Sequence, residues 1–323
     1  MSTILTTKEA PAGGDPSPSW ISERSGRGDA IFKALTIAAA ALILLALASV
    51  FVFLFTQGFA GFTQPAEVYS KYGSSFWGYV WPLLASTIVA SLIALIIAVP
   101  LAIGIALVIT QYAPSWLSTP VAYVIDLLAA VPSVVYGLWA GIYLAPRLVP
   151  IYEWLHEHFG FIPLFGDVVS SGRSISTAGI VLAIMVLPII TAISREVFAR
   201  TPRLHREAAL ALGATRWEMI RMTVFRYGRS GVISAVMLGL GRALGETMAV
   251  VMVLSPGTLF TFNLFSGSNT PSIAANIALR YRERSEGTLE VLIATGLVLF
   301  LLTFAINFAA RWAVARSERK LAG

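Results

Sequence analysis

The sequence of 323 residues contains no cysteine, only three histidines and few charged side chains. The absence of cysteine excludes disulfide bonds, thiolate metal sites and a cysteine nucleophile. Charged residues make up 12% of the chain and hydrophobic residues 57%. Such a chain has more apolar surface than a soluble core can bury, so its composition favours a membrane protein with an all-α fold.

The sequence also lacks a phosphate-binding loop. Its lysines are followed by Glu, Ala, Tyr and Leu, so none of them completes a Gly-Lys-Ser/Thr motif. Any ATP that drives this protein must therefore be bound and hydrolysed by another subunit. His156 and His158 are two residues apart and would point to different faces of a helix, so no metal site is expected there. We expect a chain that is not an enzyme and has no cofactor of its own.

Six apolar segments are each long enough to cross a bilayer as a helix, which takes about 20 residues. Residues 1–30 precede them and are rich in Gly, Pro and Ser, which predicts a disordered tail. The six spans form one predicted domain, residues 31–315, and a basic tail follows at 316–323. The predicted spans are 31–55, 83–109, 121–144, 176–194, 231–254 and 290–312.

Three of these spans contain a proline, at Pro100, Pro132 and Pro188. Proline leaves one backbone carbonyl without its helical partner, and lipid cannot satisfy that carbonyl. We therefore expect these three positions to face protein or a water-filled path.

The distribution of basic residues predicts the orientation. Most of the 23 Lys and Arg lie in the N-terminal tail, in the loop at 195–230 and at the C-terminus. By the positive-inside rule, that loop and both termini are cytoplasmic. The net charge of +6 then reflects topology, and nucleic-acid binding is not expected.

The loop at 195–230 contains signals for two helices. Thr201-Pro202 predicts an N-cap followed by the first helical residue, and Gly213 suits a left-handed turn that ends this helix. Thr215 and Glu218 fit a capping box that begins a second helix. One interpretation is an amphipathic pair resting on anionic headgroups. The other is a docking element that presents a ridge of Ala208, Ala209 and Ala211 to a groove on a partner.

The fifth span contains two charged residues, Arg242 and Glu246. On one continuous helix, Ala235, Gly239, Arg242, Glu246 and Ala249 would share a face of small and charged residues. The charges could be an i,i+4 structural pair that neutralises itself. Alternatively, Arg242 faces a translocation path and binds an oxyanion through two hydrogen bonds, while Glu246 orients Arg242 or balances its charge.

The third span contains a further charge, Asp126. A carboxylate does not attract an anion, so we expect Asp126 to pair with an arginine or a neutral donor of a neighbouring helix. Asp126 and Glu246 could instead form the relay of a proton-coupled secondary transporter. Asn307, in the sixth span, is predicted to form an interhelical hydrogen bond.

Part of the cytoplasmic loop resembles a known family. Glu207-Ala208-Ala209, then three residues and Gly213, is similar to the EAA signature of ABC-importer permeases. The resemblance implies a type I importer permease fold, with a coupling helix that sits in a cleft of a cytoplasmic ATPase. The usual Ile-x-Leu-Pro that follows is here Thr223-Val-Phe225-Arg226, without the proline. A secondary transporter would not need such a docking element.

Two further segments narrow the resemblance to phosphate-importer permeases: LLAAVPSVVYGLWA (127–140) and GRALGETMAV (241–250). Permeases for sulfate and molybdate, the alternative oxyanions, tend to carry an aromatic-glycine pair where this chain has Thr247-Met248. The resemblance implies a multi-pass subunit of the bacterial inner membrane. Its implied partners are a second related permease, two ATPase subunits and an extracytoplasmic phosphate-binding protein.

Overall fold

The computed structural model describes residues 27–69, 73–255, 257–282 and 287–322. Their structure is helical, as predicted from the composition, and no β-strand is formed within these ranges. The chain divides into two compact units, residues 1–52 and 53–323. Helix α1 (Arg27–Gly58) is one apolar helix of 32 residues that contributes the described part of the first unit.

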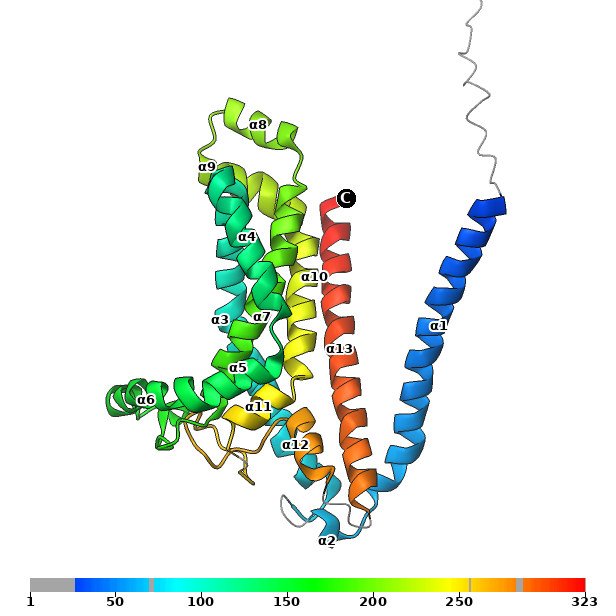
Figure 1. The fold of residues 1–323 in the computed structure, drawn as a ribbon, viewed down its shortest axis with the longest axis vertical. Coiled ribbons are helices and arrows are strands. Elements are labelled where there is room, and N and C mark those ends of the chain that lie inside the picture. The colour runs from blue at the N-terminus through cyan, green and yellow to red at the C-terminus, as the bar shows by residue number, and fades with distance from the viewer. Residues whose placement is uncertain (1–26, 70–72, 256, 283–286, 323) are drawn as a thin grey trace, which may run out of the picture. The chain divides into compact units, whose positions relative to one another are not determined.

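The second unit is a set of helices joined by turns, by π-helical segments and by longer connections between α6 and α7 and between α11 and α12 (Figure 1). Its helices are α2 (Ala66–Tyr69), α3 (Phe76–Leu107), α4 (Ser115–Ala130), α5 (Ser133–Trp139), α6 (Ala145–Phe159), α7 (Ile175–Ala199), α8 (Arg203–Ala211), α9 (Arg216–Met219), α10 (Phe225–Leu244), α11 (Met248–Val253), α12 (Ile273–Arg280) and α13 (Thr288–Ala322). The segments η3 (Val108–Tyr112), η4 (Ala140–Leu144) and η6 (Ile220–Val224) are π-helical, whereas η2 (Phe59–Phe62) and η5 (Pro163–Phe165) are 3-10 turns.

Helix α7 is the centre of this unit and packs against α3, α4 and α10. Small residues allow the close packing. A Cβ added to Gly179 of α7 would lie 2.5 Å from Cγ2 of Ile93 on α3. The facing stripe of α3 is a row of buried alanines at every fourth position: Ala90, Ala94, Ala98, Ala102 and Ala106. Small residues let the backbones of two helices approach closely and gain dispersion contacts. In lipid, such contacts drive helix association because there is no hydrophobic driving force between helices.

Five helical segments in the described ranges are long and apolar enough to cross a membrane. Four of them overlap the predicted first, second, fourth and sixth spans: Gly28–Phe62, Phe76–Tyr112, Ile175–Ala199 and Thr288–Arg316. The fifth, Ser133–Phe159, combines α5, η4 and α6, and Figure 1 shows α6 lying across the direction of α3, α7 and α13.

The predicted continuous helix at 121–144 is wrong. Helix α4 ends at Ala130, Val131 and Pro132 are extended, and α5 begins at Ser133. The ring of a proline clashes with a helical conformation of the preceding residue, so Val131 leaves the helix. Pro100 and Pro188, in contrast, lie inside α3 and α7.

The predicted continuous helix at 231–254 is also wrong. Helix α10 ends at Leu244 with Gly245 as its C-cap, and α11 begins at Met248. Glycine is a poor helix former, and Glu246 supplies an acceptor that favours a new helix start. Arg242 and Glu246 therefore belong to different segments of the chain.

Candidate functional site

Arg242 lies in the last turn of α10, where a cation interacts favourably with the helix dipole. Its side chain is exposed and forms no hydrogen bond or ion pair with another described residue. Arg242 lies roughly 25 Å along the axis of α10 from Phe225, where the helix begins. Because it is exposed and bonds to no described residue, the guanidinium of Arg242 can donate hydrogen bonds to a ligand. Because of the length of α10, it is far from α8.

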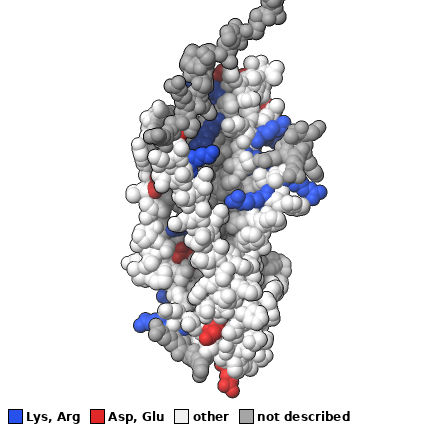
Figure 2. Space-filling view, turned by 90° about the vertical axis from the view of Figure 1, so that its right-hand side faces the viewer, with Lys and Arg blue, Asp and Glu red and all other residues white. Residues whose placement is uncertain are grey.

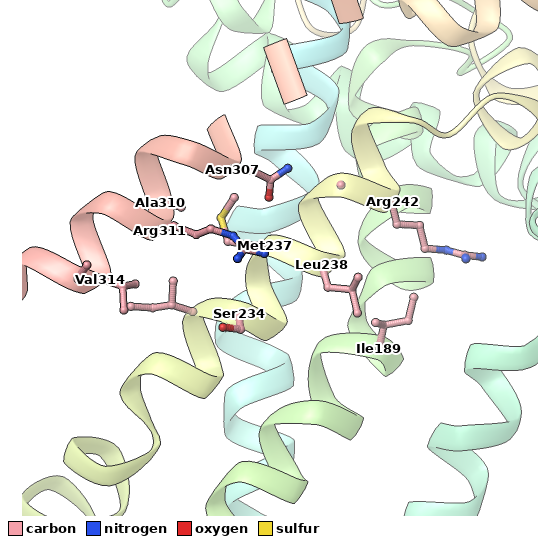
Figure 3. A pocket seen from close by; sticks show the side chains of 12 residues that line it. Ile189, Ser234, Met237, Leu238, Arg242, Asn307, Ala310, Arg311 and Val314 are labelled. Carbon is pink, nitrogen blue, oxygen red and sulfur yellow. The ribbon is translucent and has the colours of Figure 1, made fainter. Parts of the chain in front are cut away.

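Arg242 lines a groove of about 840 Å³ that α7, α10 and α13 form together (Figure 3). The polar lining residues are Ser234 and Arg242 of α10 with Asn307 and Arg311 of α13. Figure 3 shows the Arg242 side chain pointing away from Asn307 and Arg311. The two guanidinium groups thus face different surroundings.

Asn307 does not form the predicted interhelical hydrogen bond within the described chain. Its Nδ2 donates to the carbonyl of Thr303, one turn earlier on α13, at 2.9 Å. An asparagine that bonds to its own helix leaves the opposite helix without a polar contact at this position. Asn307 contributes polarity to the groove instead.

Glu246 is buried, with 9% of its surface exposed, and lies between α10 and α11. Its Oε1 accepts a hydrogen bond from the backbone N–H of Ala249 at 3.2 Å. The first N–H groups of a helix have no intrahelical partner, so this carboxylate caps α11 from the position before its N-cap residue, Thr247, whose own side chain does not cap the helix. No basic group of the described residues lies within ion-pair distance of Glu246, so Arg242 and Glu246 do not form the i,i+4 structural pair that was one of the two interpretations.

Gly137 of α5 and Gly141 of η4 explain why α11 lies where it does. A Cβ at Gly137 would lie 2.7 Å from the Cα of Ala249, and one at Gly141 would lie 2.8 Å from the carbonyl oxygen of Met252. The backbone of α11 therefore packs directly on this pair. These two glycines were not predicted from the sequence, although their four-residue spacing is the signal of a small-residue helix contact.

Replacing Glu246 tests whether it acts as a cap or as a charge. Glu246→Ala removes the acceptor for Ala249 and should destabilise the protein by about 0.5–2 kcal/mol. Glu246→Gln keeps an acceptor oxygen without the charge and should retain most of this stability. Thermal unfolding of the purified protein measures both. Equal destabilisation by Gln and Ala would contradict the capping role.

Asp126 pairs with an arginine of a neighbouring helix, as predicted. Arg195 Nη2 of α7 lies 3.4 Å from Asp126 Oδ2 of α4. Both side chains are partly exposed, so this ion pair contributes little to stability by itself. The ion pair joins α4 to α7 near the start of α8.

The loop after α7 forms the predicted helix, glycine turn and second helix. Gly213 ends the turn after α8 with φ of +85°, a left-handed conformation that glycine adopts without steric cost. Thr215 and Glu218 form the predicted capping box at the start of α9. The hydrogen bonds from the Thr215 backbone amide and hydroxyl lower the pKa of Glu218, because they favour its charged form.

Two details of this loop differ from the prediction. Pro202, rather than Thr201, occupies the N-cap position of α8, and no side chain caps this helix. Ala209 is buried against Ile220 and its neighbours, so it cannot be part of an exposed ridge. Leu204 and Leu212 are 79% and 89% exposed, and the sequence analysis did not identify them.

The exposed residues of α8 thus include Glu207, Ala208 and Leu204, and Leu212 is exposed at its C-cap. Contiguous apolar patches mark interaction sites, so these leucines are candidates for contact with a partner. The predicted docking residues Glu207, Ala208 and Gly213 lie on this surface, whereas Ala209 supports α8 from beneath.

Comparison with known proteins identifies relatives. A family model described as "Binding-protein-dependent transport system inner membrane component" matches residues 98–322. The chain is similar to a protein of Xylella fastidiosa named "Phosphate transport system permease protein PstC", with 40% identity over 334 residues and 99% of each chain covered. It is also 53% identical to "Phosphate transport system permease protein PstC 2" of Mycobacterium tuberculosis over 208 residues, 63% of this chain and 64% of that protein. The match therefore spans less than two thirds of the mycobacterial relative.

Among solved structures, the chain is similar to part of a bacterial ABC transporter involved in the import of the acidic polysaccharide alginate. The TM-score is 0.53 at 18% sequence identity, and the match covers 89% of this chain and 96% of the other. At this identity the similarity concerns the fold alone, and it confirms the predicted importer-permease fold.

Proposed function

Since this chain belongs to the family of binding-protein-dependent transport system inner membrane components, we propose that it is the permease subunit of an ATP-driven importer for inorganic phosphate. One observation carries the choice of substrate: 40% identity along essentially the whole chain to a protein named for phosphate transport. The family membership itself makes the chain an integral membrane protein.

The chemistry of Arg242 supports an oxyanion as the substrate. Guanidinium presents several N–H donors in one plane and can bind two oxygens of a phosphate at once. Arg242 is exposed and has no carboxylate partner in the described chain, so a passing anion would not have to displace one. Glu246 is engaged with α11 and leaves this guanidinium available.

The proposal includes a partner for each region of the permease. Helix α8, with the exposed Leu204 and with Leu212 at its C-cap, would contact one of two cytoplasmic ATPase subunits. A second, related permease would complete the passage beside Arg242, and an extracytoplasmic phosphate-binding protein would deliver the anion. ATP is bound and hydrolysed by the ATPase subunits in this scheme, and this chain contributes the coupling surface.

The proposed orientation puts α8 and the two termini in the cytoplasm. On the face drawn in Figure 2, more Lys and Arg side chains are visible in the upper half than in the lower half. Figure 1 places α8 and the C-terminal end of α13 at that upper end. Basic residues near the ends of membrane helices favour the cytoplasmic side.

A proton-coupled relay through Asp126 and Glu246 has less support. Asp126 pairs with Arg195, and Glu246 caps α11, so each carboxylate already has a structural partner. The exposed α8 has no evident use in a transporter that works without an ATPase. We therefore retain the ATP-driven mechanism.

Uptake of labelled phosphate tests the proposal in cells that lack this subunit. Restoring the chain should restore uptake, and excess unlabelled phosphate should compete whereas equal amounts of sulfate or molybdate should not. Competition by sulfate or molybdate at the same concentration would instead assign another oxyanion. Cells carrying the chain without its ATPase provide the control and should show background uptake.

A further inference from the structure

A second cavity, separate from the groove beside Arg242, lies next to α8. It has a volume of about 740 Å³, and we call it the α8 pocket. Its charged lining residues are Asp126, Arg195, Glu196, Arg203 and Arg206, contributed by α4, α7 and α8. It connects the helix that the proposed function assigns to ATPase contact with two helices of the membrane bundle.

The charges of the α8 pocket are unevenly paired. Asp126 is bound by Arg195, and Glu196 is bound by Arg200. Arg203 has no carboxylate partner in the described chain, and Arg206 has only a long contact of 3.4 Å from Nη1 to Oε1 of Gln111. Two guanidinium groups thus provide positive charge beyond what the local carboxylates balance, which favours an anionic ligand.

Independent evidence for a ligand comes from Thr201. This residue lines the α8 pocket and is 2% exposed, yet its hydroxyl has no hydrogen-bond partner in the described chain. An unpaired polar group at this depth costs free energy, so a bound acceptor would compensate for it. Thr201 lies directly before Pro202, at the start of α8.

The start of α8 supplies further donors. No side chain caps this nine-residue helix, so its first backbone N–H groups have no side-chain acceptor. The N-terminus of a helix favours a negatively charged group through both its free amides and its dipole. A hydroxyl, uncapped amides and two guanidinium groups are donors that suit the oxygens of a phosphate.

We propose that the α8 pocket binds phosphate at the cytoplasmic face and that its occupation slows further import. The inference rests on the proposed function, because phosphate is then the transport product that accumulates on this side. A phosphate held by Thr201, Arg203 and Arg206 lies in a pocket whose other walls are α4 and α7, so it favours the arrangement in which α8 and these two helices enclose it. In the proposed mechanism α8 moves with the ATPase, so a ligand that binds one arrangement more tightly reduces turnover.

The test uses the complete transporter reconstituted in phosphatidylcholine vesicles, with the ATPase subunits outside. Labelled phosphate and the binding protein are loaded into the lumen. ATP hydrolysis is followed by a coupled assay for ADP while unlabelled phosphate is added outside. The wild type should slow as outside phosphate rises.

Thr201→Val removes the unpaired hydroxyl with little change of shape, and Arg206→Gln removes a charge. Each should raise the half-inhibitory phosphate concentration about tenfold, the equivalent of losing one charge-assisted hydrogen bond. Thr201→Ser keeps the hydroxyl and should behave like the wild type. Arg229→Gln removes an exposed arginine outside the pocket and should leave the half-inhibitory concentration unchanged.

Equal inhibition of the wild type, Thr201→Val and Arg206→Gln would overturn the proposal, because inhibition would then arise at the ATPase. A difference between variants only when phosphatidylglycerol is present would assign the pocket to a lipid headgroup and overturn product feedback. Release of the labelled lumenal phosphate, measured without outside phosphate, reports separately on the proposed function. Its failure would refute phosphate transport whatever the inhibition shows.

Discussion

Arg242→Gln should reduce phosphate uptake about a hundredfold while the assembled transporter persists. Gln cannot provide two charge-assisted hydrogen bonds to one phosphate, and losing two such bonds at about 1.5 kcal/mol each corresponds to this factor. The wild-type side chain is exposed and bonds to no described residue, so its removal should not disturb folding. Uptake of labelled phosphate and co-purification of the subunits measure the two effects.

Arg242→Lys is the matched variant, since it keeps the positive charge and loses the planar pair of donors. Uptake between those of the wild type and Arg242→Gln would indicate that both charge and geometry matter. Arg311→Gln provides a second control, because Arg311 lines the same groove and its side chain faces away from that of Arg242 (Figure 3). Normal uptake by Arg242→Gln, or loss of the complex, would remove Arg242 from the substrate path.

Gly213→Val should uncouple ATP hydrolysis from transport and reduce uptake by about tenfold or more. The φ of +85° is a severe outlier for a β-branched residue and costs about 1–3 kcal/mol, so the turn between α8 and α9 would change its conformation. The surface around Leu204 and Leu212 would then no longer fit the ATPase. The ratio of ATP hydrolysed to phosphate transported measures the coupling.

The surroundings of Gly213 offer a matched control. A Cβ at this position meets no atom within 4 Å, so the requirement for glycine within this chain is conformational. Asparagine tolerates the left-handed region far better than valine does, and Gly213→Asn should retain most of the coupling. Equal loss in Gly213→Asn would indicate that the partner fills this space. Unchanged coupling in Gly213→Val would contradict docking by this loop.

Features that depend on neighbours in the sequence were predicted well. The capping box of Thr215 and Glu218 and the turn at Gly213 involve residues within one helical turn, so local spacing is sufficient to identify them. The apolar segments of α3, α7 and α13 are long enough that their helical state follows from composition.

Helix breaks were predicted poorly, because a helix can either end or continue at a proline or a glycine. Hydrophobicity continues through Pro132 and through Gly245, so the pattern alone predicted unbroken helices at both positions. The helix breaks at Pro132 but continues through Pro188, which is buried in the centre of the bundle. Packing of α5 against α11 accompanies the second break, and that contact joins residues far apart in the sequence.

By itself, the sequence determined the membrane class, the positions of the long apolar helices and the glycine-hinged loop, because composition and local spacing carry that information. Only the tertiary structure decided the roles of the charged residues. It separated Glu246 from Arg242, gave Asp126 its partner Arg195 and buried the Thr201 hydroxyl beside the α8 pocket. The physical reason is that an ion pair or a cap forms where backbones bring donor and acceptor together, and helix ends and packing set those positions.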